Sequence, residues 1–370
     1  MDTPPDARRH PAGDHHRGPG RTGGGAAMNG PVLLTAAAGA FLLSAAATPL
    51  LRRVALRWDV TDRPGGHKAH RRPTPFLGGL AITLGAVVPP AALAGPADPR
   101  AVAIVAGALA VALLGLIDDL RQLSMGARLA VESLAAGGVV LTGVQAPVTG
   151  GWPDIPITML WIVVITNSFN LLDNMDGALG AVAAASAATL AAVAFLSAQP
   201  VIGMVLVSLL LSVAGFLPYN WAPAKIFMGD AGSLFIGFVL ACSAALLVTG
   251  RDRVTAVAGL LLPAFVATVD TGVVLLSRKR AGRPLTQGGT DHLSHRLCGL
   301  GLGPALTAVT LAVIAAVAGL LHLVMLLGWI TPLGAASAGV VAACALIGLP
   351  QRVRVYPRAL PQTSSPTGKR

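Results

Sequence analysis

Charged residues are scarce in this chain of 370 residues, where Asp, Glu, Lys and Arg together make up 12 %. Soluble domains carry about 25 % charged residues, so this low content excludes an ordinary water-soluble protein. Cysteine is also scarce, and the three cysteines, at positions 242, 298 and 344, form no C-x-x-C pair. Their number and spacing exclude a disulfide-stabilised scaffold and a cysteine-based zinc site. Glutamate occurs once, as Glu132, so aspartate supplies nearly all the acidic side chains.

Hydrophobic residues make up 54 % of the chain, and its mean hydropathy is +0.70. A bilayer core about 30 Å thick needs roughly 20 apolar residues per helix. Eleven apolar runs approach that length, at 31–51, 77–95, 100–117, 127–144, 157–172, 178–197, 200–218, 232–249, 254–276, 303–327 and 330–349. The alternating segments typical of membrane barrels are not found. The sequence therefore predicts an all-α, polytopic membrane protein with about eleven transmembrane helices.

The predicted transmembrane catalytic domain covers residues 28–350 and lies between two polar tails. Residues 1–27 are rich in Gly, Pro, Arg and His, which predicts a disordered tail. Met28 is a candidate start of the chain, because the first apolar run follows it directly. Residues 351–370 form a short basic tail, which we expect in the cytoplasm.

The chain has 27 Lys and Arg against 16 Asp and Glu, a formal net charge of +11. Nineteen of these 27 basic residues fall in the loops that follow the odd-numbered runs, and Arg128, at the second position of the fourth run, makes twenty on that side. Basic residues stay in the cytoplasm, so these loops are predicted to be cytoplasmic. The positive charge thus follows from membrane topology, and no nucleic-acid partner is predicted.

Most aspartates outside the runs fall in, or at the edges of, the same predicted cytoplasmic loops, which suggests one polar face able to bind metal and phosphate. Asp118 and Asp119 end the third run side by side. Two carboxylates at a helix C-terminus face the negative end of the helix dipole and repel each other. A bound Mg2+ would relieve both effects, because magnesium favours carboxylate and phosphate oxygens. A solvated helix end is the alternative for this pair.

Polar residues at every third position close the fifth run, in the segment NSFNLLDNMDG. They are Asn167, Asn170, Asp173 and Asp176. On a helix this spacing produces one slowly drifting stripe, so all four are able to face a single site. Amide and carboxylate groups together supply donors, acceptors and metal or base oxygens. Helix capping is the alternative interpretation.

A short glycine-rich segment, FMGDAGS, lies where a cytoplasmic loop enters the eighth run. Backbone amides at a helix N-terminus attract anions, and small residues let a phosphate approach closely. Asp230 in this segment is a candidate metal ligand. Simple N-capping of the helix is the alternative.

Two further loops combine basic and imidazole side chains, which are Lys68 and His70 after the first run and His292, His295 and Arg296 after the ninth. The positive-inside rule alone also accounts for the first loop. A zinc site would need more ligands in tighter order, so phosphate binding is the better interpretation of the second. Asp270, inside the ninth run, costs about 2.5–3.5 kcal/mol at a helix centre and must face protein. We interpret Asp270 as structural.

The motifs, in their order along the chain, resemble those of the polyprenyl-phosphate N-acetylhexosamine-1-phosphate transferases (glycosyltransferase family 4). The motifs are D-x-P-x-x-x-K-x-H-x-x-P-x-P-x-x-G-G from Asp62 to Gly79, Asp-Asp, N-x-x-N-x-x-D-x-x-D-G, G-D-x-G-S and D-H-x-x-H-R. The resemblance covers roughly residues 31–349. It implies a membrane enzyme of ten or eleven spans that transfers a sugar 1-phosphate from a UDP-N-acetylhexosamine to a polyprenyl phosphate and releases UMP. The histidine and Thr-Pro stretches are closer to the UDP-N-acetylglucosamine branch. Members of this branch catalyse the first step in the synthesis of O-antigen, teichoic acid or arabinogalactan linkers.

The resemblance also implies roles for residues. Mg2+, for which Mn2+ is a possible substitute, is expected on Asp230 and Asp119. Either Asp118 or Asp119 would deprotonate or orient the lipid phosphate. Asp173 and Asp176 are expected to be catalytic with Asp118 and Asp119, and they would position the nucleotide sugar. The expected substrate-binding residues are Asn167 and Asn170, together with Lys68, His70, His292, His295 and Arg296, which would hold phosphates. One departure is Asn174, where many relatives have Gly, and it leaves both neighbouring aspartates in place.

The expected partners are UDP-N-acetylglucosamine, a polyprenyl phosphate and the bacterial plasma membrane, with the active site in the cytoplasm. A homodimer is compatible with the resemblance. Two other functions stay open at this point. A phospho-N-acetylmuramoyl-pentapeptide transferase would share the chemistry with a different sugar nucleotide. A lipid-linked sugar transporter would be expected to place charges at mid-bilayer and to show inverted repeats, and neither is evident in the sequence.

Overall fold

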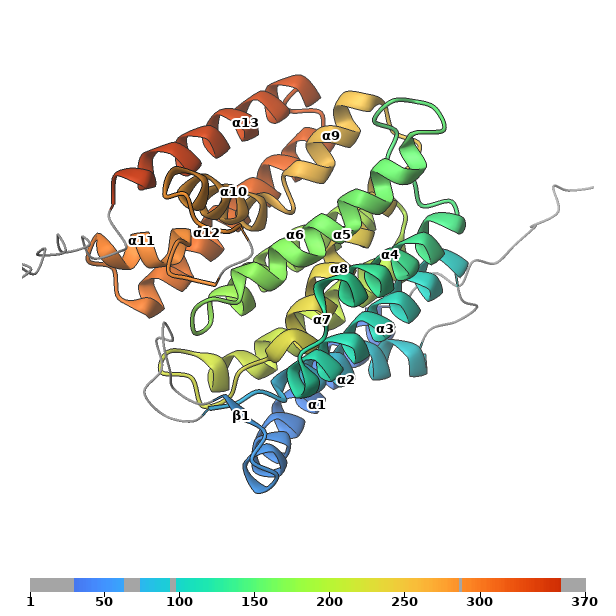
Figure 1. Ribbon diagram of the computed structural model, residues 1–370. Helices are drawn as coiled ribbons and strands as arrows, with labels where there is room; N and C mark the ends of the chain where they lie inside the picture. Colours follow the sequence, from blue (N-terminus) through green and yellow to red (C-terminus); the bar gives the residue numbers. More distant parts are fainter. Residues whose placement is uncertain (1–29, 63–73, 94–97, 286–287, 354–370) are drawn as a thin grey trace, which may run out of the picture.

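The computed structural model describes residues 30–62, 74–93, 98–285 and 288–353 of the chain (Figure 1). Nearly all elements in these residues are helices, with one antiparallel pair of two-residue strands. The elements are α1 Gly30–Arg57, β1 Thr61–Asp62, β2 Thr74–Pro75, α2 Gly78–Leu93, α3 Pro99–Arg121, α4 Met125–Leu141, α5 Asp154–Leu172, α6 Ala178–Leu196, α7 Pro200–Asn220, α8 Gly229–Val248, α9 Arg253–Leu261, α10 Phe265–Arg280, α11 Leu293–Gly299, α12 Pro304–Leu326, α13 Pro332–Gly348 and the 3-10 helix η1 Leu349–Arg352. The predicted all-α fold is confirmed. The predicted tails 1–27 and 351–370 lie outside the described residues, except for 351–353.

Each predicted apolar run falls on a helix. Among the described helices, eight are long and apolar enough to cross a membrane, or nine when α9 and α10 are counted as one bent span. Helices α2 and α4 are shorter, with 16 and 17 residues. These findings confirm a multi-pass membrane protein, whereas the predicted count of eleven spans is not confirmed.

The ninth predicted run, 254–276, is broken instead of continuous. Helices α9 and α10 meet at an angle of 73° across the short link 262–264. Pro263 lies in this link, and proline lacks an N–H and clashes with the preceding turn of a helix. The Pro263 carbonyl accepts a hydrogen bond of 3.0 Å from the Ser186 hydroxyl on α6. A neighbouring helix thus satisfies a backbone group that the break leaves free.

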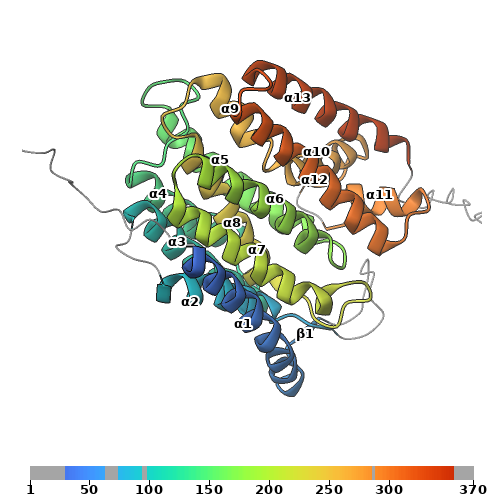
Figure 2. The same cartoon turned by 180° about the vertical axis from the view of Figure 1, so that it is seen from behind.

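Helix α8 is the centre of the bundle. All of its residues from 231 to 248 are buried, and α2, α3, α5, α6, α7 and α9 pack around it (Figures 1 and 2). Gly115 lets α3 pack closely against α8, because a Cβ atom at this position would lie 2.4 Å from the Asp230 carbonyl oxygen. The close contact brings the end of α3 against the start of α8.

The loops after the odd-numbered runs gather at one end of the bundle. There the Phe227 N–H donates to the Pro75 carbonyl over 2.8 Å, and the Ala224 N–H donates to the Asp176 carboxylate over 2.8 Å. At the opposite end, the Gln145 N–H donates to the Thr249 hydroxyl over 3.2 Å. The two sets of loops therefore lie on opposite faces, as the distribution of Lys and Arg predicts.

Candidate active site at one end of the bundle

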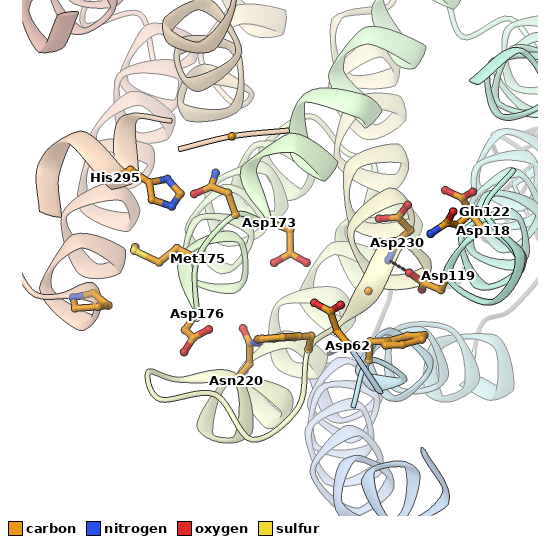
Figure 3. Close-up of a pocket in the computed structure, with 16 residues that line it drawn as sticks. Asp62, Asp118, Asp119, Gln122, Asp173, Met175, Asp176, Asn220, Asp230 and His295 are labelled. Atoms are coloured by element: carbon orange, nitrogen blue, oxygen red, sulfur yellow. Dashed lines mark hydrogen bonds between the residues drawn. The ribbon is translucent and has the colours of Figure 1, made fainter. Parts of the chain in front are cut away.

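A cavity of about 650 Å3 opens at the end of the bundle where the odd-numbered loops meet (Figure 3). Its walls come from β1, the end of α3, the α5–α6 turn, the α7–α8 loop and α11. Six aspartates line it, namely Asp62, Asp118, Asp119, Asp173, Asp176 and Asp230. Among its described lining residues there is no Lys or Arg. The cavity therefore concentrates negative charge and oxygen ligands.

Asp119 joins the end of α3 to the start of α8. Its carboxylate accepts hydrogen bonds from the backbone N–H groups of Asp230, over 3.0 Å, and of Ala231, over 3.3 Å. The residue before α8, Met228, provides no side-chain cap of its own. Because a negative charge is favourable at a helix N-terminus, Asp119 acts as the cap of α8 from another helix.

Asp118 and Asp230 share one arginine. Arg128 Nη1, from α4, lies 2.7 Å from Asp118 Oδ2 and 3.3 Å from Asp230 Oδ2. The second oxygen of Asp230 accepts from Asn170 Nδ2 over 2.9 Å, and the same amide donates to Ser233 Oγ over 2.8 Å. The Asp230 carboxylate, which is predicted to bind metal, is thus contacted by Arg128 from α4 and by Asn170 from α5, and Ser233 of α8 in turn binds Asn170.

The α5–α6 turn carries Asp173 and Asp176 into the cavity (Figure 3). Gly177, at φ +71°, allows the chain to turn into α6, and its N–H donates to Asn220 Oδ1 over 3.1 Å. Burial and, to a smaller extent, the negative charges of Asp230, Asp119 and Asp176 together raise the pKa of Asp173 to about 7. Asp173 is therefore a carboxyl group close to its titration point at neutral pH.

The histidine segment before and within α11 forms another wall of the cavity. His295 lines the cavity, and burial lowers its pKa, with the nearby His292 acting in the same direction. His292 lies inside the protein, where its Nδ1 is 2.8 Å from Asp270 Oδ2, and the Leu293 N–H donates to Asp270 Oδ1 over 2.7 Å. Asp270 faces protein, as predicted, and anchors the start of α11 to α10.

Of the predicted site residues, the structure brings Asp118, Asp119, Asp173, Asp176, Asp230 and His295 to the cavity wall, with Asn170 bonded directly behind Asp230. Lys68 and His70 lie in 63–73, outside the described residues. Asn167, His292 and Arg296 are not among the lining residues.

The side chains of Asn167 and Arg296 stabilise the fold. Asn167 Nδ2 donates to Glu132 Oε2 and to the Val163 carbonyl. Arg296 is 2 % exposed, and its Nη1 donates to the carbonyls of Pro350, over 2.9 Å, and Val353, over 2.8 Å. It thus ties α11 to the end of the last membrane helix, and the geometry does not present it to a substrate.

Three residues of the site were assigned no role from the sequence, and Asn174 was noted there only as a departure from the motif of many relatives. Arg128 lies at the start of the fourth apolar run and was counted only as one of the basic residues on the predicted cytoplasmic side. Asn174 lines the cavity, and its amide oxygen accepts a hydrogen bond from the Ser294 hydroxyl. Asn220, at the end of α7, fixes both sides of the site, because its Nδ2 donates to the Ile226 carbonyl over 3.1 Å. Arg128 and Glu132, four residues apart in a run that is otherwise almost free of charge, were the available signal for Arg128.

The described residues contain no group of three His, Cys, Asp or Glu side chains already gathered as a metal centre. The donor set nevertheless fits a hard divalent cation, because carboxylate oxygens are its preferred ligands. Asp119 and Asp230, in contact through the Asp230 N–H, are the residues that would hold such an ion.

Residues 101–248 match the family model described as glycosyl transferase family 4. A putative glycosyltransferase of Streptomyces coelicolor is 39 % identical over 295 residues, which are 75 % of this chain and 69 % of that protein. A probable undecaprenyl-phosphate N-acetylglucosaminyl 1-phosphate transferase of Bacillus subtilis is 30 % identical over 280 residues, 72 % of this chain and 77 % of that protein.

A decaprenyl-phosphate N-acetylglucosaminephosphotransferase of Mycolicibacterium smegmatis is 30 % identical over 299 residues, 69 % of this chain and 72 % of that protein. A phospho-N-acetylmuramoyl-pentapeptide-transferase of Desulforamulus reducens is also similar, at 28 % identity over 264 residues, 64 % of this chain and 77 % of that protein.

Proposed function

The chain belongs to glycosyl transferase family 4, and on this premise we propose that it transfers N-acetylglucosamine 1-phosphate from UDP-N-acetylglucosamine to a polyprenyl phosphate, with release of UMP. The observation that carries the proposal is the cavity of six aspartates at one end of a membrane bundle. Two relatives are named for N-acetylglucosamine phosphate transfer to undecaprenyl or decaprenyl phosphate, which supports this donor and acceptor.

Carboxylates dominate the cavity wall within the described residues, so a bound cation would help the cavity to accept a diphosphate. Six carboxylates lie around it, and Arg128 neutralises part of the charge of only two of them. Mg2+, or Mn2+ in its place, would supply the positive charge that neutralises the diphosphate and the UMP leaving group. We assign Asp230 and Asp119 as its ligands, since both carry oxygens at the same point of the cavity wall.

The reaction exchanges one phosphorus–oxygen bond for another. An oxygen of the polyprenyl phosphate attacks the β-phosphorus of the donor, and the bond from this phosphorus to the bridging oxygen breaks. UMP leaves with the bridging oxygen, and the product is a polyprenyl diphosphate that carries N-acetylglucosamine. Asp118 or Asp119 orients the attacking phosphate, and since a phosphate monoester titrates near pH 6, orientation contributes more than proton removal.

Asp173 and Asp176 lie on the opposite wall, where we assign them to the nucleotide sugar. The raised pKa of Asp173 also makes it a second candidate for moving a proton, because a general base works best when its pKa lies near the working pH. His295, on the same side of the cavity as Asp176, is the one imidazole among the described lining residues, and we assign it to the donor as well (Figure 3).

We assign the cavity to the cytoplasmic face of a bacterial plasma membrane. Most Lys and Arg residues fall in the loops at the same end of the bundle as the cavity, in line with the positive-inside rule. The expected donor is a nucleotide sugar, which is a cytoplasmic metabolite class, and this supports the same orientation.

Two alternatives are weaker. The pentapeptide transferase reaction would use the same cavity, but the relatives named for N-acetylglucosamine transfer match at higher identity. A transporter would be expected to line a path through the bundle with charge, whereas the carboxylates here gather at one end.

The test is UMP release by the purified full chain in detergent. Mg2+, polyprenyl phosphate and UDP-N-acetylglucosamine are each omitted in turn, and release that requires all three supports the proposal. Release with UDP-N-acetylmuramoyl-pentapeptide in place of the N-acetylglucosamine donor would move the assignment to the other branch. A folded, metal-loaded sample that releases UMP from neither donor would refute the transferase assignment.

A further inference from the structure

Glu132, the single glutamate of the chain, is buried in α4 with one unpaired oxygen. The residue is 0 % exposed, and its Oε2 accepts a hydrogen bond from Asn167 Nδ2. Within the described residues, Oε1 has no hydrogen-bond partner. An unpaired buried polar atom destabilises the folded protein, and more so when it is charged. A proton on Oε1 would leave it equally unpaired, because the hydroxyl formed would need an acceptor. Glu132 is therefore a costly residue in this structure.

Arg128 lies one helical turn before Glu132 on α4. Side chains four residues apart on a helix are neighbours and readily form ion pairs. Arg128 nevertheless points to the cavity, where Nη1 is 2.7 Å from Asp118 Oδ2 and 3.3 Å from Asp230 Oδ2. Glu132 is close enough to interact electrostatically with both Arg128 and Asp230. The guanidinium thus has carboxylates on two sides and currently contacts those of the cavity.

A divalent cation at Asp230 changes this balance. Such an ion and the guanidinium repel each other and compete for the oxygens of Asp230. The contact between Arg128 and Asp230 is the longer of the two cavity contacts, so it is the one that gives way. On α4, the buried side-chain acceptor described without a hydrogen-bond partner is Glu132 Oε1, four residues after Arg128.

We propose that Glu132 provides a second position for the Arg128 guanidinium, which turns from Asp230 Oδ2 to Glu132 Oε1 when a divalent cation binds Asp230. Glu132 is then a positioning residue for Arg128, and Asn167 holds Glu132 Oε2 so that Oε1 stays free to accept. In the metal-free protein Arg128 stabilises the cavity carboxylates, and in the metal-bound protein it neutralises Glu132. This inference rests on the cation site of the proposed function.

The exchange predicts effects of opposite sign for two variants on the affinity for Mg2+. Glu132→Gln keeps the shape of the side chain but weakens the acceptor for the displaced Arg128, so the affinity falls. Hydrogen bonds to charged groups contribute about 1.5–3 kcal/mol, which corresponds to a fall of roughly 10- to 100-fold. Arg128→Gln removes the competitor at Asp230, so the affinity rises.

The double variant separates this exchange from a simple charge effect. If Glu132 acts only through its charge, Glu132→Gln weakens Mg2+ binding equally with and without Arg128. If the exchange occurs, the effect of Glu132→Gln disappears in the Arg128→Gln background, because no guanidinium needs a second position. Asp252→Asn, which removes one exposed negative charge at the opposite end of the bundle, is the control and leaves Mg2+ binding unchanged.

The experiment titrates Mg2+ into the full chain in detergent without substrate and follows the apparent melting temperature, so it does not depend on activity. The expected order of Mg2+ affinity is Arg128→Gln above the unchanged protein, and the unchanged protein above Glu132→Gln. Equal effects of Glu132→Gln in both backgrounds, or a lower affinity in Arg128→Gln, would overturn the inference. Absence of any Mg2+ effect on the unchanged protein would instead refute the cation site itself. If Glu132→Gln fails to fold, Glu132→Asp, whose shorter side chain withdraws the acceptor from Arg128, takes its place in the same comparison with and without Arg128.

Discussion

The cap that Asp119 provides to α8 allows its structural and catalytic contributions to be separated by two substitutions. Asp119→Ala removes both hydrogen bonds, those from the N–H groups of Asp230 and Ala231, and leaves α8 without a side-chain cap. Asp119→Asn keeps one carbonyl oxygen as an acceptor and removes the charge. Both substitutions remove the carboxylate that we assign to the metal and the lipid phosphate.

The expected stability changes follow from this geometry. Loss of an N-cap costs about 0.5–2 kcal/mol, and loss of a negative charge at a helix N-terminus costs about 0.3–1 kcal/mol more. Asp119→Ala therefore lowers the free energy of unfolding by roughly 1–3 kcal/mol. In Asp119→Asn the lost charge also relieves repulsion from Asp118 and Asp230, so its stability stays within about 1 kcal/mol of the unchanged protein.

The assay measures the apparent melting temperature in detergent with EDTA, together with UMP release at saturating Mg2+. A loss of 1–3 kcal/mol corresponds to roughly 2–12 °C, on the scale of 2–4 °C per kcal/mol for domains of 150–250 residues. Asp98→Ala is the control. Asp98 is the N-cap of α3, at the opposite end of the bundle, and its carboxylate accepts a hydrogen bond of 3.0 Å from the Arg100 N–H. The substitution removes this cap.

We expect Asp98→Ala to lose stability and keep UMP release, Asp119→Asn to keep stability and lose UMP release, and Asp119→Ala to lose both. Equal melting temperatures for the two Asp119 variants would refute the capping role. Normal UMP release by Asp119→Asn would refute the assignment of its carboxylate to the reaction.

Three further predictions concern other parts of the site. Asp230→Asn should abolish UMP release while size-exclusion chromatography shows an unchanged protein, and near-normal turnover would remove Asp230 from the metal site. Gly115→Ala places a Cβ atom 2.4 Å from the Asp230 carbonyl oxygen, so it should lower stability by about 1–3 kcal/mol and reduce turnover. Gly126→Ala, where no heavy atom lies within 4 Å, is the control in the same melting assay. The pKa of Asp173 is about 7 in the folded protein and near 3.9 in the unfolded chain, so the folded protein holds the proton more tightly. The contribution of this carboxyl to stability is therefore greatest below pH 3.9 and is lost as the pH rises to 7. In EDTA, the stability of Asp173→Asn should therefore fall less between pH 4 and pH 7 than that of the unchanged protein, and parallel pH profiles would contradict the raised pKa.

The sequence was sufficient to predict the helices and the face on which the aspartates meet. Long apolar runs and the side of the membrane on which loops lie depend on composition, which is local information. The break between α9 and α10 depends on more than Pro263 alone, because a proline in a membrane helix produces only a kink when the helix on either side stays packed in line. The position of α6, whose Ser186 bonds the Pro263 carbonyl, is not visible in the sequence.

Residue spacing alone was not sufficient to assign Asn167 and Asn170. They lie three residues apart on α5, and a shift of three residues on a helix leaves a difference of about 60° around the axis. That difference directs Asn170 to Asp230 and Asn167 to Glu132. Which neighbour each amide meets depends on where α4 and α8 pack, and this is a property of the tertiary structure.

The sequence was also not sufficient to predict which side chains of a short helix face the cavity. His295 lines the cavity, whereas Arg296, the next residue, turns inward and bonds the carbonyls after α13. A short helix such as α11 has no apolar periodicity long enough to indicate its buried face. The last residues of the described chain decide this orientation, and they lie far from the histidine motif in sequence.

The fully buried position of α8 also has a consequence for biosynthesis. A ribosome releases α2, α3, α5, α6 and α7 before α8, yet in the finished bundle α8 lies among them. These earlier helices cannot close on one another in their final arrangement until α8 is inserted, because it occupies their common centre. Asp119 and Asp230 therefore first meet when α8 enters. Insertion of α8 thus delivers the wall of the cavity that carries Asp230, and a chain that stalls before α8 contains five of the six aspartates without a site.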